Sequence, residues 1–60
     1  MEFIRLHQHY GDGREIYINM RHITTVYTDE DGLTNVTLMN GGGVVVSETV
    51  EHILHLIYLF

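Results

Sequence analysis

Residues 34–60 constrain the fold of this chain most, because they specify consecutive elements with almost no residues left to connect them. Their sequence is TNVTLMNGGGVVVSETVEHILHLIYLF. Residues 35–39 alternate between apolar and polar side chains, which is typical of a strand with one buried face. Asn40-Gly41 is a strong hairpin signal. The run of valines at 44–46 then predicts a strand that is covered on both faces.

The last part of this segment predicts an amphipathic helix. Thr49, or alternatively Ser47, can serve as its N-cap, because both side chains can accept a hydrogen bond from a backbone N–H of the first turn. The carboxylates of Glu48 and Glu51 are suited to the positive end of the helix. Apolar residues then recur at the spacing of one helical face, which we expect to cover the sheet: Val50, Ile53, Leu54 and Ile57.

The first half of the chain predicts three more strands with short connections. The strands are expected at 2–8, 15–19 and 23–28, with a glycine turn at 11–13, a helical corner at 19–22 and an acidic turn at 29–32. Alternation places Ile4 and Leu6 on one face of the first strand, and it places Ile16 and Ile18 inward on the second. Phe3, Arg5 and His7 lie on the opposite face of the first strand, and Glu15 and Tyr17 face outward on the second.

These elements predict an α+β fold in which a small antiparallel sheet of about five short strands, barrel-like or strongly bent, precedes one C-terminal amphipathic helix. We expect residues 1–60 to form a single domain. A chain of 60 residues buries only about 60% of the surface that its unfolded form exposes. Because cysteine is absent, disulfides cannot reinforce this small core, and oligomerisation becomes the favoured means of stabilisation.

The charge and hydropathy of the chain exclude two classes of partner. The formal net charge is −5, with three basic residues and eight acidic ones, so the chain offers little to neutralise nucleic-acid phosphates. The longest nearly apolar run covers 53–60, whereas a membrane-spanning helix needs about twenty residues. No signal peptide is visible at the start of the chain. We therefore expect a cytoplasmic protein without a membrane span that does not bind nucleic acid.

The helix carries more apolar side chains than one buried face requires. Those expected on its outer surface are Leu56, Tyr58, Leu59 and Phe60. Leaving a large apolar side chain in water forgoes about 1.5–3 kcal/mol relative to burial. We therefore predict that these four residues form an interface, that the chain is a homo-oligomer, and that it binds a protein partner.

No motif in the sequence predicts catalysis, a cofactor or a metal centre. His7 and His9 lie two apart on a predicted strand, and His52 and His55 lie three apart on the predicted helix, yet neither pair has the further ligands of a zinc site. The glycines at 41–43 lead into a strand, whereas a phosphate-binding loop leads into a helix. We expect no catalytic, cofactor-binding or metal-binding residues, and we predict that the protein is not an enzyme.

Several of these short patterns resemble the FlbD-like (SwrD-like) family of small flagellar proteins. The resemblance covers about residues 14–59 and rests on Ile16-Tyr17-Ile18-Asn19, Ile23, residues 34–38, Asn40-Gly41, Val45-Val46 and Glu48-Thr49-Val50. The chain departs from the family pattern in lacking a proline before the central strand and in lacking lysine near its end, which marks a divergent member. The resemblance implies a non-enzymatic accessory protein of flagellar motor function or swarming.

The leading hypothesis from the sequence is a small protein-interaction module that self-associates. One alternative is an oligomer that binds a small molecule or a metal in pockets between subunits lined by histidine and tyrosine. Another is an acidic inhibitor of the kind that phages encode, which would occupy a basic groove on its target. Five histidines favour a pH-sensitive surface in any of these cases.

Overall fold

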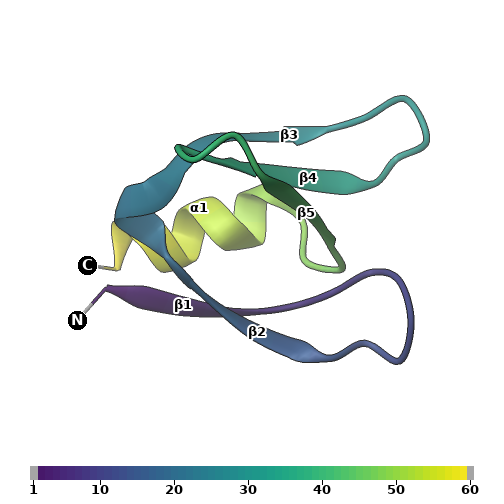
Figure 1. The fold of residues 1–60 in the computed structure, drawn as a ribbon, viewed down its shortest axis with the longest axis horizontal. Helices are drawn as coiled ribbons and strands as arrows, with labels where there is room; N and C mark the ends of the chain where they lie inside the picture. The colour runs from purple at the N-terminus through teal and green to yellow at the C-terminus, as the bar shows by residue number, and fades with distance from the viewer. Residues whose placement is uncertain (1, 60) are drawn as a thin grey trace.

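The computed structural model describes residues 2–59, which form five short strands, a 3₁₀ turn and one α-helix (Figure 1). The elements are β1 (Phe3–His7), β2 (Glu15–Asn19), η1 (Met20–His22), β3 (Ile23–Thr28), β4 (Thr34–Leu38), β5 (Gly43–Val46) and α1 (Val50–Tyr58). The α+β class predicted from the sequence, with one helix after the strands, is confirmed.

The strands form two antiparallel sheets, so the prediction of one sheet is wrong. β1 pairs with β2, and β3, β4 and β5 form a second sheet in that order. Within residues 2–59, β2 and β3 do not pair, and the strands do not close into a barrel. The cause is η1, whose 3₁₀ turn leads the chain from one sheet into the other.

The two sheets meet where the end of β1 passes β5. Gln8 and Val46 form an isolated antiparallel bridge. On either side of this bridge, His9 N donates to Val45 O, and Ser47 N donates to His7 O, both at 2.9 Å. The two sheets are therefore joined by a few hydrogen bonds between segments far apart along the chain.

The helix lies between the two sheets and closes the core (Figure 1). Its side chain Ile53 is fully buried, together with side chains from both sheets. The buried apolar residues are Ile4, Leu6, Ile18, Val36, Val46 and Ile53. Ile18, which was predicted inward, is buried, and Ile4 and Leu6, which were predicted to share one face, are buried together, because strand alternation sends every second side chain to the same face.

The face of α1 that packs on the core differs from the predicted stripe. Leu54 was expected to face the sheet, yet it is exposed, whereas Leu56 was expected on the outer surface and instead packs against the core. Helical geometry explains both results. Ile53 is the centre of the buried face, so residues three and four positions further on flank it, namely Leu56 and Ile57. Leu54 is rotated by about 100° from that centre.

Local turn chemistry fixes the connections. Asn19 caps η1 by accepting a hydrogen bond at Oδ1 from Arg21 N, at 3.0 Å. Asp29 organises the acidic turn, since its Oδ1 accepts hydrogen bonds from Asp31 N and Leu33 N, both at 2.9 Å. These two bonds and one from the Asn35 side chain lower the pKa of Asp29, with the bond from Leu33 the strongest cause. In the turn between β4 and β5, the φ of Gly41 is +89°, a conformation that favours glycine.

Candidate functional site

The outer surface of α1 exposes three apolar side chains near its C-terminal end. Tyr58 is 81% exposed, Leu59 is 68% exposed and Leu54 is 38% exposed. Two residues of the predicted interface, Tyr58 and Leu59, thus lie on the surface. Leu56 is partly buried against the core. Phe60, the fourth predicted interface residue, lies outside the described residues.

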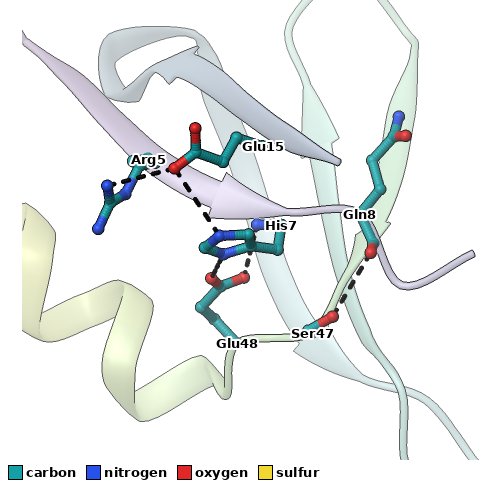
Figure 2. A network of polar contacts seen from close by, with 6 residues as sticks. All are labelled: Arg5, His7, Gln8, Glu15, Ser47 and Glu48. Atoms are coloured by element: carbon teal, nitrogen blue, oxygen red, sulfur yellow. Dashed lines mark hydrogen bonds and ion pairs between the residues drawn. The ribbon is translucent and has the colours of Figure 1, made fainter. Parts of the chain in front are cut away.

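The N-terminal end of α1 is fastened to β1 by a polar clamp, which we define as the pair His7 and Glu48. His7 Nδ1 donates to Glu48 Oε2 at 2.7 Å, and the backbone N–H of His7 donates to Glu48 Oε1 at 2.9 Å (Figure 2). These two residues are 41 positions apart in the sequence. One carboxylate therefore holds both the backbone and the side chain of the last residue of β1.

The clamp extends the ladder between β1 and β5 past the point where β5 ends. The carbonyl of His7 accepts a hydrogen bond from Ser47 N. In an antiparallel ladder the N–H and C=O groups of one residue point to the same side, so the N–H of His7 points to this side as well. The chain turns away after Ser47 toward the helix. The Glu48 carboxylate therefore accepts the hydrogen bond from His7 N that a backbone carbonyl would accept if the ladder continued.

The Glu48 side chain is only 14% exposed. Burial alone would raise its pKa, but the hydrogen bonds from the His7 side chain and backbone together outweigh burial, and the pKa of Glu48 is lowered below its usual value. Glu48 is therefore ionised at neutral pH. The sequence predicted that Glu48 would interact with the positive end of the helix, whereas its carboxylate contacts β1. Thr49 caps the helix through its hydroxyl.

Two further groups surround the clamp on the outer face of the first sheet. The His7 ring lies between two carboxylates, with Glu15 Oε2 at 4.0 Å from Nε2, and Arg5 lies 3.2 Å from the same Glu15 oxygen (Figure 2). On the other side of the clamp, the Ser47 hydroxyl lies 3.5 Å from the carbonyl of Gln8. The network links β1, β2 and the start of α1, so it positions the helix relative to the first sheet.

The histidines do not gather in the described part of the chain. The ring of His7 faces Glu48, whereas the ring of His9 packs edge-on against Tyr10 at a centroid distance of 4.9 Å. Within residues 2–59, no group of three or more histidine, cysteine, aspartate or glutamate side chains is placed to hold a metal ion. His7 and His9 thus make separate contacts.

The outer faces of the sheets carry further exposed aromatic side chains that the sequence analysis did not treat as an interface. Phe3 on β1 and Tyr17 on β2 share one face, and Tyr17 is 63% exposed. A shallow hollow of about 250 Å³ lies beside Tyr10, where β5 meets the end of β1. Strand alternation had placed Tyr17 outward and Phe3 on the face opposite Ile4 and Leu6, so that signal was available in the sequence. The contact between His7 and Glu48 had no such signal, because one sequence does not show which distant residues meet.

No helix in the part of the chain that the structure describes is long and apolar enough to cross a membrane. The arrangement as a whole is a rigidly fastened helix with exposed apolar side chains at one end and a second aromatic surface on the first sheet. Such surfaces are suited to binding proteins.

The chain was compared with known proteins in three ways. Residues 4–60 match a protein family described as FlbD, flagellar and swarming motility proteins. This match covers nearly the whole chain and includes both sheets and the helix. No curated protein and no solved structure matches the chain.

Proposed function

Because this chain belongs to the FlbD family of flagellar and swarming motility proteins, we propose that it is a non-enzymatic accessory protein of motility. It acts in the cytoplasm by self-association and by docking on another protein of the motility apparatus. Its activity lies in the surfaces that it presents to these partners.

The exposed apolar end of α1 carries this proposal. Leu54 and Tyr58 are four residues apart and therefore neighbours on the helix surface, and Leu59 follows at the end of the helix. All three are exposed despite the small size of the core. We assign these three residues, together with Leu56 at the edge of the core and Phe60, to the docking surface of the helix.

The polar clamp supports the same proposal. A docking surface binds more tightly when it is held in its bound geometry, because less conformational entropy is lost on binding. Glu48 fixes the start of α1 to β1, and the buried side chain of Ile53 fixes its middle to the core. The exposed end of the helix is thus presented on a rigid base.

A double substitution, Tyr58→Glu with Leu59→Glu, tests the docking surface. In flagellated cells that lack their own copy of the protein, we expect the wild-type chain to restore swarming and the double variant to fail. The reason is that two carboxylates replace apolar area that must leave water on docking. The measurement is the rate of swarm expansion, with protein levels checked by immunoblotting and the folded state checked by circular dichroism.

The matched control is His52→Glu with Glu51→Gln, because these residues are also exposed on α1 and lie away from the apolar end. This control should swarm like the wild type. Normal swarming by a folded Tyr58→Glu, Leu59→Glu protein would overturn the assignment of the docking surface.

A further inference from the structure

The backbone of β2 presents unpaired hydrogen-bonding groups at the edge of the first sheet. Gln8 N donates to Arg14 O, and Met20 N donates to Glu2 O, both at 2.9 Å. Paired and unpaired residues alternate along an antiparallel ladder, so the even-numbered residues of β2 bond to β1. The odd-numbered residues therefore direct their N–H and C=O groups away from β1, and these residues are Glu15, Tyr17 and Asn19.

The N–H and C=O groups of Glu15 and Tyr17 have no other backbone hydrogen bond within residues 2–59, whereas the carbonyl of Asn19 begins the 3₁₀ turn η1. In Figure 1, the first part of β2 lies at the lower border of the molecule, and the strand then crosses β1 on its way to η1. Proteins commonly protect such an edge with lysine, proline or a bulge. The chain contains no lysine or proline, and β2 pairs with β1 in an unbroken register.

The free edge of the second sheet differs in its register. β3 has a break in register between Ile23 and Thr25, where one extra residue bulges from the ladder. Bulges twist an edge and discourage pairing with another strand. The β2 edge is thus the one that is suited to accept a further strand.

The sequence of β2 is complementary to itself in the antiparallel direction. If two copies of β2 meet with Tyr17 opposite Tyr17, the outward N–H and C=O groups of one strand face those of the other. These groups can then form hydrogen-bonded pairs. In this register Ile16 lies opposite Ile18 of the second copy, and Glu15 lies opposite Asn19, so no like charges face each other. A two-fold axis through Tyr17 satisfies every pair at once, as an isologous dimer requires.

We propose that β2 pairs with β2 of a second copy of this chain across a two-fold axis at Tyr17, which joins two first sheets into one continuous sheet. This inference rests on the self-association in the proposed function and specifies its surface. The exposed rings of Tyr17 and Phe3 from both copies line one face of the joined sheet. The apolar end of α1 then stays available for a different protein.

Charge substitutions at Tyr17 test this pairing, since the axis places residue 17 opposite its own copy. Tyr17→Lys alone and Tyr17→Glu alone should each run as a monomer of about one chain mass, because like charges then face each other across the axis. An equimolar mixture of the two variants should restore the dimer. The measurement is light scattering coupled to size exclusion at low salt, where wild type should show twice the 7.0 kDa of one chain.

Tyr27 provides the matched control, because it is an exposed tyrosine on β3, the other edge strand. Tyr27→Lys and Tyr27→Glu should keep the wild-type mass. An oligomer that survives in both Tyr17 variants, or a mixture that stays monomeric, overturns the β2 pairing and leaves self-association by another surface. A monomeric wild type overturns both this pairing and the self-association in the proposed function, while the swarming experiment tests the helix surface independently.

Discussion

Replacing Ile53 with alanine is expected to lower the free energy of unfolding by about 2–5 kcal/mol. Ile53 is fully buried and contributes the centre of the helix face that packs between the two sheets. Truncating it removes apolar contact area and leaves a cavity. Domains have a stability of about 0.05–0.15 kcal/mol per residue, so this loss is a large part of the total for a chain of 60 residues. The measurement is urea denaturation followed by far-ultraviolet circular dichroism.

Leu54→Ala is the matched control for this prediction, because the neighbouring side chain is on the same helix but exposed. We expect it to change the free energy of unfolding by less than about 1 kcal/mol. Equal losses in the two variants would contradict the helix orientation described above. That orientation also separates the roles of the two residues, since Ile53 holds the helix and Leu54 faces outward.

The second large effect is expected from Glu48→Gln. The substitution removes the charge that accepts two hydrogen bonds from His7, and hydrogen bonds to charged groups contribute about 1.5–3 kcal/mol. The variant should therefore unfold at a lower urea concentration at neutral pH. Its helix should still form, because Thr49 remains as the N-cap.

The pH dependence of stability follows from the lowered pKa of Glu48. A carboxyl whose pKa is lower in the folded state contributes stability above its unfolded pKa. For Glu48 that unfolded value is near the ordinary 4.5, and the contribution is lost as the pH falls below it through the lowered folded pKa. Wild type should thus lose stability over this range, and Glu48→Gln should lose less because it has no charge to neutralise.

Glu51→Gln is the control for both parts of the Glu48 prediction. Glu51 lies in the first turn of α1 and is exposed, so its charge interacts mainly with the helix dipole, which contributes about 0.3–1 kcal/mol. Its pH profile should stay close to that of wild type. A Glu48→Gln profile parallel to wild type through pH 4.5 and below would contradict the role assigned to the clamp.

The elements of this fold could be predicted from the sequence because their signals are local. The strands at 15–19 and 23–28 have the predicted bounds, and the helix begins after Thr49, as one of the two proposed caps required. Asn19 and Asp29 occupy the turns that their side chains favour. Alternation and capping act over a few residues, so they remain visible in a single sequence.

The remaining features depend on contacts between distant segments. The sequence predicted the helical corner at 19–22 but not that β2 and β3, on either side of η1, would belong to different sheets. Leu56 packs against the core and Leu54 is exposed, the reverse of the prediction. This reflects how the helix is rotated about its axis when it packs on a core built from both sheets. The partnership of His7 with Glu48 joins opposite ends of the chain, and neither residue type nor spacing specifies it.

The bridge between β1 and β5 also determines the order in which this molecule can assemble. The β1–β2 hairpin and the β3–β4–β5 meander pair neighbours in sequence, and such contacts form within microseconds. The bridge at Gln8 and Val46 instead requires a long loop to close, which carries a larger entropic cost. We therefore expect the folding rate to be governed by the meeting of the β1–β2 hairpin and the β3–β4–β5 meander, and the two sheets that pack on α1 to come together only at that step.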